Sequence, residues 1–125
     1  MKKVIMTDRA PAPVGPYSQA IEVDGTLYCS GQISIDPSSG EVFTGDIQKQ
    51  AQMVMKNVEA VLAAADMTFG NVVKTTIFLT DMADFAKVNE VYASCFTAEP
   101  PARSCVAVAS LPKGVNVEVE VLARR

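Results

Sequence analysis

An arginine and a glutamate in the C-terminal quarter of the chain have the types and spacing needed to handle a small organic anion. Arg103 enters the run Pro100-Pro101-Ala102-Arg103-Ser104-Cys105-Val106, whose other residues are small or apolar. Glu118 follows fifteen positions later, in the apolar alternation 115–121. A guanidinium matches a carboxylate with two parallel hydrogen bonds and stays charged at any working pH. If the two strands pair, the glutamate would stand near the bound anion as a proton acceptor.

The composition limits the chemistry that is open to these residues. The chain has no histidine, which excludes Ser-His-Asp and Cys-His catalysis and zinc sites of the HExxH type. Cys29, Cys95 and Cys105 have no CxxC spacing and are expected to be reduced thiols, not a disulfide or a metal site. We therefore predict no metal and no cofactor, and catalysis must use carboxylates, arginine, hydroxyls, thiols or backbone groups.

Length and charge predict one domain, residues 1–125, with a small-molecule partner. Hydrophobic residues make up 49% of the 125, enough for a core without disulfides. The net charge is −3 and the basic residues are scattered, so nucleic acid is not expected as a main partner. The apolar run at the N-terminus is too short for a signal sequence, and the longest uncharged apolar run, 60–65, is too short to cross a membrane. We expect a cytoplasmic protein without membrane contact.

Hydrophobic periodicity predicts an α+β fold. Apolar residues recur at three and four positions in two segments, predicting helices from an Asp46 cap to about residue 66 and over 82–96. Asp24-Gly25 is typical of a type I′ turn between two paired strands. Strands are predicted at 4–6, 19–23, 26–30, 72–79, 103–109 and 115–123. This order favours a mixed sheet with both helices on one face.

Strand parity in the segment 103–109 indicates a homo-oligomer. Alternate residues of a strand point to opposite faces, and neither face of 105–109 is polar, so both should be covered. Two helices cover only one side of a sheet of this width. The other side requires a second copy of the chain, and sites at subunit interfaces would follow.

Essentially the whole chain resembles the reactive-intermediate (imine) deaminase family, also called the Rid or YjgF-type family. The resemblance rests on Gly15-Pro16-Tyr17-Ser18-Gln19-Ala20, Ser30-Gly31-Gln32, Val58, Lys74-Thr75-Thr76, Asp84-Phe85, Asn89 with Tyr92, and above all Pro101-Ala102-Arg103-Ser104 with Leu111-Pro112 and Val117-Glu118. Two departures are mild: Val119 stands where the family more often has isoleucine or methionine, and the loop before Pro100 is short. The resemblance implies a chorismate-mutase-like fold, a mostly antiparallel sheet, and a homotrimer with clefts between subunits.

The resemblance also implies an activity and a set of site residues. Members of the family hydrolyse 2-imino acids, the enamine/imine products of pyridoxal-phosphate dehydratases, to 2-keto acids and ammonia, and 2-iminopropanoate and 2-iminobutanoate are the expected substrates. By position, Arg103 matches the carboxylate-binding arginine and Glu118 the water-orienting glutamate. The water would also contact a backbone carbonyl near Cys105. The remaining matches are pocket positions: Tyr17, Ser30, Gly31, Asn89 and Cys105.

Pattern alone leaves other roles open for these residues. Arg103 could be an ordinary solvated arginine, and Glu118 and Glu120 could both be solvent-facing strand residues. Tyr17 could simply anchor its loop, while Cys105 is expected to be a packed residue, not a nucleophile. The main functional alternative is a non-catalytic protein that binds keto acids or other small carboxylates. An endoribonuclease or translation inhibitor, as suggested for relatives, and a chaperone-like surface are further alternatives.

Overall fold

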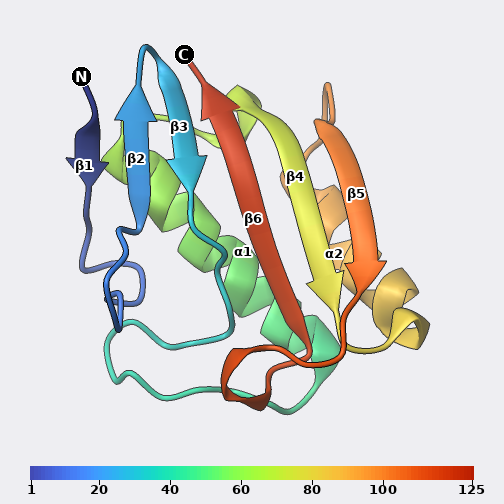
Figure 1. Ribbon diagram of the computed structural model, residues 1–125. Helices are drawn as coiled ribbons and strands as arrows, with labels where there is room; N and C mark the ends of the chain where they lie inside the picture. The colour runs from blue at the N-terminus through green and yellow to red at the C-terminus, as the bar shows by residue number, and fades with distance from the viewer.

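The computed structural model describes residues 1–125 as a six-stranded sheet with two helices on one face (Figure 1). The strands are β1 (Lys3–Ile5), β2 (Ala20–Val23), β3 (Thr26–Cys29), β4 (Val72–Leu79), β5 (Ala102–Ala107) and β6 (Val117–Arg124), and the helices are α1 (Ile47–Ala64) and α2 (Phe85–Cys95). Short 3₁₀ turns occupy Phe69–Asn71, Met82–Asp84 and Pro112–Gly114. The predicted α+β class, mixed sheet and pair of helices are confirmed.

The strand order is β1-β2-β3-β6-β4-β5, so the C-terminal strand lies inside the sheet (Figure 1). All neighbours are antiparallel except β4 and β5, which are parallel and joined through α2. The pairing that would have placed Glu118 beside Arg103 is wrong, because β4 separates their strands. Thr75 of β4 lies opposite Arg103, and Phe78 of the same strand lies opposite Glu118.

Local chemistry explains where several elements begin and turn. Asp24 and Gly25 have φ angles of 50° and 80° between β2 and β3, the left-handed backbone that a type I′ turn requires. The Asp46 carboxylate accepts a hydrogen bond from the Lys49 backbone N–H at 3.0 Å, which satisfies one of the free donors at the start of α1. Both features were expected from the sequence.

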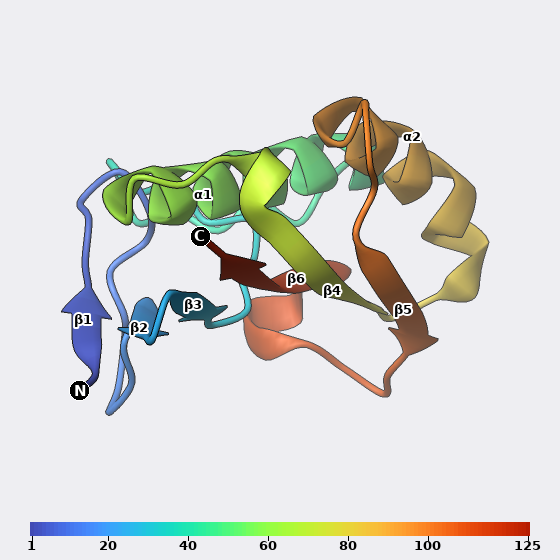
Figure 2. The ribbon, with the colours of Figure 1, turned by 90° about the horizontal axis from the view of Figure 1, so that it is seen from above.

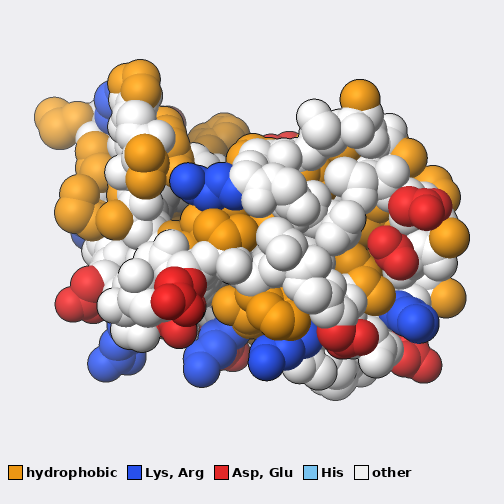
Figure 3. All heavy atoms as spheres, turned by 90° about the horizontal axis from the view of Figure 1, so that it is seen from below, with side chains coloured by type: hydrophobic (Ala, Val, Ile, Leu, Met, Phe, Trp, Pro, Cys, Tyr) orange, Lys and Arg blue, Asp and Glu red, His pale blue; other side chains and the backbone are white.

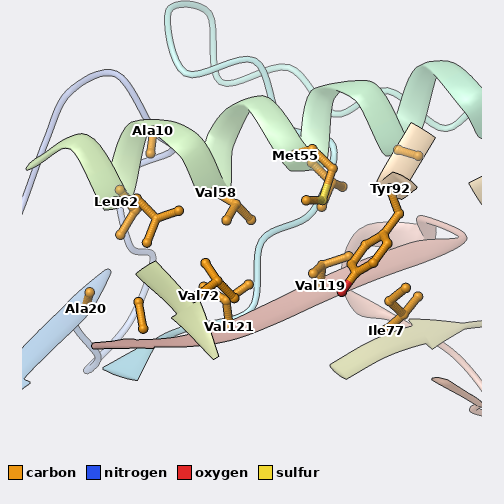
Figure 4. Close-up of a cluster of buried hydrophobic side chains, with 14 of the residues drawn as sticks. Ala10, Ala20, Met55, Val58, Leu62, Val72, Ile77, Tyr92, Val119 and Val121 are labelled. Carbon is orange, nitrogen blue, oxygen red and sulfur yellow. The ribbon is translucent and has the colours of Figure 1, made fainter. Parts of the chain in front are cut away.

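The core lies between α1 and the sheet. Alternate residues of β6, from Val117 to Ala123, face the helices and are at most 4% exposed. Figure 4 shows side chains of α1, among them Val58 and Leu62, pointing toward Val119 and Val121 of this strand. Burial of each such side chain contributes about 1.5–3 kcal/mol. This packing holds β6 firmly, and therefore also the residues on its opposite face.

No helix covers the other face of the sheet, because α1 and α2 lie on the same side (Figure 2). Apolar residues lie on this open face, where Ile21 is opposite Tyr28 and Tyr28 is opposite Leu122. Tyr28 and Val106 are 52% and 44% exposed. Nor is strand β5 covered on both faces: it is an edge strand, and only Cys105 in it is half-buried.

Neither helix is long and apolar enough to cross a membrane.

Two buried amide side chains fix the loops at the end of the sheet where β6 begins. The Gln19 side chain accepts a hydrogen bond from the Thr7 backbone at 2.7 Å and donates one to the Pro11 carbonyl at 2.9 Å. Asn57 of α1 donates to the carbonyls of Ile33 and Ile35 at 3.1 and 2.9 Å. Buried amides are costly unless paired, so these contacts hold the segments 7–19 and 30–35 in defined positions.

Candidate functional site

The first group of candidate residues, here called the arginine cluster, consists of Arg103 and the α2 residues Phe85, Asn89 and Tyr92. Arg103 Nη1 donates a hydrogen bond to Asn89 Oδ1 at 2.7 Å. Its Cζ lies 5.3 Å from the ring centroid of Phe85 and 5.0 Å from that of Tyr92. The spacing i, i+4, i+7 places the three α2 residues on one stripe of the helix. That stripe meets the guanidinium at the edge strand.

The side chains of α2 that contact Arg103 are neutral. The one salt bridge of the chain joins Arg125 to Glu22, so Arg103 has no carboxylate partner. Its side chain is held by an amide oxygen and two aromatic faces, which orient a cation without cancelling its charge. Because Arg103 is also exposed, its remaining N–H groups are available to an incoming anion. This environment favours anion binding over a structural ion pair.

The cysteine thiols are poor candidates for catalysis. Cys105 lies on the same face of β5 as Arg103 and is half-buried. Burial raises the pKa of its thiol, although the nearby Arg103 charge acts in the opposite direction. Burial alone raises the pKa of Cys29 to about 12. Since the thiolate is the reactive form, these shifts favour packing roles, as expected for Cys105.

The second group, here called the glutamate pocket, contains Tyr17, Ser30, Gly31 and Glu118. These residues line a hollow of about 500 Å³ together with Pro112 and Lys113. The Ser30 hydroxyl donates to the Ser18 carbonyl at 2.6 Å, which ties the end of β3 to the loop that carries Tyr17. Tyr17 is 54% exposed at the edge of the hollow. The interpretation of Tyr17 as a pocket residue is therefore consistent with its position.

Gly31 and Glu118 are in direct contact across the sheet. The backbone groups of Gln32 and Val119 exchange two hydrogen bonds, of 2.8 and 3.1 Å, and so fix the neighbouring residues side by side. A Cβ atom on Gly31 would overlap the Glu118 side chain, reaching 2.8 Å from its Cδ. Burial, and secondarily the charge of Glu120, raise the pKa of the Glu118 carboxyl. The pocket thus holds a carboxylate that binds protons more readily than usual.

The two groups are far apart within one chain. Arg103 projects to the helix side of the sheet, whereas Glu118 projects to the open face. Their strands are separated by β4, and Arg103 is three residues along β5 from Val106, the position level with Glu118. Two strand spacings and three residue rises each amount to about 10 Å. One small organic acid cannot touch both groups in a single copy.

A second hollow and the charged residues of one face do not add to the candidate site. A larger hollow, of about 1030 Å³, lies beside α1 and the segment 35–38, but contains none of the candidate residues. On the face shown in Figure 3, Lys and Arg side chains alternate with Asp and Glu and form no continuous basic band. A band of that kind is typical of surfaces that bind nucleic acid.

Comparison with known proteins then identifies the family. The sequence model of the family described as endoribonuclease L-PSP matches residues 7–125. The chain belongs to this family. A mouse protein named 2-iminobutanoate/2-iminopropanoate deaminase is 50% identical over 123 residues, which cover 98% of this chain and 91% of the mouse protein. The expected Rid-type family is therefore confirmed, and the expectation of an enzyme agrees with the name of this relative.

Two solved structures share the fold of this Rid-family chain throughout. The Rid-family protein YyfA from Yersinia pestis has a TM-score of 0.98 and 49% identity, with complete coverage of both chains. Escherichia coli TdcF, solved with bound serine, has a TM-score of 0.94 and 44% identity, covering 98% of each chain.

The structure divides the residues expected from the sequence between the two groups. Arg103, Asn89 and Cys105 lie on the helix side of β5, and Tyr17, Ser30, Gly31 and Glu118 line the glutamate pocket. Sequence analysis treated Phe85 and Tyr92 as apolar positions of their helix and as part of the family resemblance, but did not predict them as site residues. Their spacing from Asn89 indicates that the three side chains share one helix stripe, but it does not indicate the contact with Arg103.

Proposed function

We propose that this protein hydrolyses 2-imino acids to 2-keto acids and ammonia at a site formed between two copies of the chain. The observation that carries the proposal is the separation of an uncompensated arginine from a glutamate pocket on the other face of the sheet. Each group is held by contacts within its own chain, yet neither can process a small acid alone. Bringing two copies together supplies both groups to one substrate.

The open face of the sheet supports such an assembly. Tyr28, Phe78, Val106 and Leu122 lie on the same face as Glu118, and no helix of the same chain covers them. An exposed apolar sheet face of this kind is typical of a subunit interface. We propose a homotrimer, in which the β5 edge of one copy lies over the glutamate pocket of the next. This head-to-tail contact closes after three copies.

In the proposed reaction, Arg103 of one copy holds the substrate carboxylate with two hydrogen bonds. Glu118 of the neighbouring copy accepts a proton from water as the water oxygen attacks C2 of the imine. Glu118 passes the water protons to the nitrogen, and the water oxygen forms the C2=O double bond as the C2–N bond breaks, which releases ammonia and a 2-keto acid. Positioning can supply several kcal/mol of the barrier reduction, and a carboxylate base a further ~10²–10⁴-fold in rate. The raised pKa of Glu118 suits a group that must take up and release a proton.

The relatives support the same class of substrate. The mouse relative is named for 2-iminobutanoate and 2-iminopropanoate, and these are the substrates that we propose here. The TdcF structure holds serine, whose carboxylate neighbours a carbon bearing nitrogen, as in an imino acid. Both observations fit an arginine that binds the carboxylate next to the reacting carbon.

The description of the family as an endoribonuclease suggests a second candidate, cleavage of RNA. The net charge of −3 and the absence of histidine speak against it, as does the lack of a basic band on the face in Figure 3. RNA binding would show itself by affinity that falls steeply with salt. Binding of keto acids without turnover is the other alternative, and it uses the same arginine.

In the test, a dehydratase generates 2-aminoacrylate, and the rate of pyruvate formation is measured with the wild type, Arg103→Ala and Glu118→Gln. We expect each variant to lose at least about 10²-fold in rate. The two variants are then dissociated, mixed and reassembled. In a mixed trimer one interface combines an intact arginine with an intact glutamate, so activity should return, while light scattering reports the assembly.

Three outcomes would contradict the proposal. Undiminished clearance of the imine by Arg103→Ala would remove the proposed role of the arginine. Failure of mixed oligomers to regain activity would place the complete site in one copy. Saturable binding of pyruvate by the wild type, with no acceleration of its formation, would establish the non-catalytic alternative.

A further inference from the structure

We propose that Tyr92, anchored by Thr75, is a positioning residue that sets the orientation of the Arg103 guanidinium for catalysis. This inference rests on the proposed function, since it concerns the arginine that binds the substrate carboxylate. According to this proposal, the hydrogen bond between the Tyr92 and Thr75 hydroxyls affects catalysis, and packing alone does not require that bond. Neither residue is placed to touch the substrate.

The geometry ties the tyrosine ring to the strand position beside the arginine. The Tyr92 and Thr75 hydroxyl oxygens are 2.7 Å apart in a buried hydrogen bond. Tyr92 is 5% exposed and Thr75 is 1% exposed. In the parallel pairing of β4 and β5, Thr75 lies directly opposite Arg103. Thr75 therefore lies next to the Arg103 backbone and also anchors the Tyr92 ring that lies against the guanidinium.

Neighbouring aromatic rings also restrain the Tyr92 ring. The centroid of Phe96 lies 4.7 Å from that of Tyr92, and Phe69 meets Phe96 edge-on at 5.3 Å. Burial raises the pKa of the Tyr92 hydroxyl above its usual value, so the hydroxyl remains neutral beside the cation. Tyr92 is thus restrained by an aromatic neighbour and by a hydrogen bond at its tip.

A fixed ring has a specific consequence for the arginine. A free arginine side chain samples many rotamers, and the only hydrogen bond that holds this one goes to Asn89. The Tyr92 face, 5.0 Å from Cζ, limits the tilt of the guanidinium plane. A tilted guanidinium would still attract a carboxylate, but would hold C2 away from the attacking water. Small misplacements of this kind reduce the chemical step strongly.

The test compares Tyr92→Phe, Thr75→Val and the double variant. Each single variant leaves one buried hydroxyl without a partner, whereas the double variant removes both. We expect kcat to fall about tenfold in Tyr92→Phe, with KM within about threefold of the wild type. In the double variant the melting temperature should recover relative to the single variants, but kcat should stay low, because the ring has lost its anchor.

Thr26→Val is the matched control. Its hydroxyl accepts a hydrogen bond from Arg124 Nη1 at 2.6 Å and lies outside both residue groups. This variant should lower the melting temperature without changing kcat. The inference is wrong if both single variants keep kcat within twofold, or if kcat recovers together with melting temperature in the double variant. Full activity of Arg103→Ala would instead overturn the proposed function, so the two failures are distinguishable.

Discussion

The arginine cluster and the glutamate pocket belong to one sheet but are built in different ways. The cluster is compact in the fold: three residues of one helix stripe contact one side chain of the adjacent edge strand. The pocket is assembled from loops that buried amides such as Gln19 hold in place. Secondary structure positions the Arg103 guanidinium. Hydrogen bonds from side chains to the backbone position the loops around the Glu118 carboxylate.

The two regions also differ in their electrostatics, and the two environments complement each other. The cluster leaves the Arg103 charge without a counter-ion. The pocket raises the pKa of Glu118 through burial and the charge of Glu120, and so disfavours its ionised form. A substrate with a carboxylate at one end and an electrophilic carbon next to it would meet a receptive cation and a proton acceptor. This contrast supports a site in which neither region is sufficient.

The largest expected effect comes from adding a methyl group at Gly31, which lies against the Glu118 side chain. Gly31→Ala places a methyl group against the carboxylate, which must swing aside. Because the displaced atoms are the end of a flexible side chain, the free energy of unfolding should change by less than about 1 kcal/mol. Loss of a positioned base should lower kcat at least about 10²-fold. Steady-state kinetics and chemical denaturation on the same sample measure both quantities.

Gly70→Ala is the matched substitution for this prediction. Its added methyl would meet only Thr68 Oγ1, at 3.4 Å, far from both groups. We expect kcat like that of the wild type. Equal activity of the Gly31 and Gly70 variants would show that the contact with Glu118 has no part in the reaction.

A smaller effect is expected from giving Arg103 a counter-ion. Asn89→Asp places a carboxylate oxygen where the amide oxygen now accepts from Nη1 at 2.7 Å. The new charge would compete with the substrate carboxylate, so KM should rise about tenfold. Because screening weakens exposed charges, the difference from the wild type should shrink in high salt.

Ser94→Asp adds the same charge at an exposed position on a different side of α2. Its KM should stay close to that of the wild type. If both aspartate variants raise KM equally, a general repulsion explains the result, and the neutral environment of Arg103 has no special role.

The elements themselves were largely predictable, because their signals are local. The strand 72–79 has the predicted bounds, and the Asp24-Gly25 turn and the Asp46 cap are where the sequence placed them. Each depends on residues within a few positions, such as a positive φ or a side chain that reaches a nearby N–H. The face shared by Glu118 and Glu120 also followed from simple alternation.

The site was less predictable, because it depends on which strands become neighbours. Alternation shows that Arg103 and Cys105 share a face, but not that β4 will lie between them and Glu118. Parallel pairing of β4 and β5 is a long-range result of the crossover through α2. The contact of Tyr92 with Arg103 depends on that same pairing. A periodic stripe could reveal Tyr92 as buried, but not as the partner of a charged residue.

The smallest expected effect concerns the pH dependence of the glutamate pocket. Activity requires the ionised carboxylate, and a raised pKa places the acid limb of kcat/KM above the usual glutamate value of 4.5. Glu120→Gln removes the neighbouring negative charge but leaves the burial of Glu118 unchanged. The pKa should therefore fall and the acid limb should move to lower pH. Glu90→Gln, an equal charge change on the exposed side of α2, should leave the limb in place. A limb that stays fixed in Glu120→Gln, with assembly intact by light scattering, would mean that another group controls it.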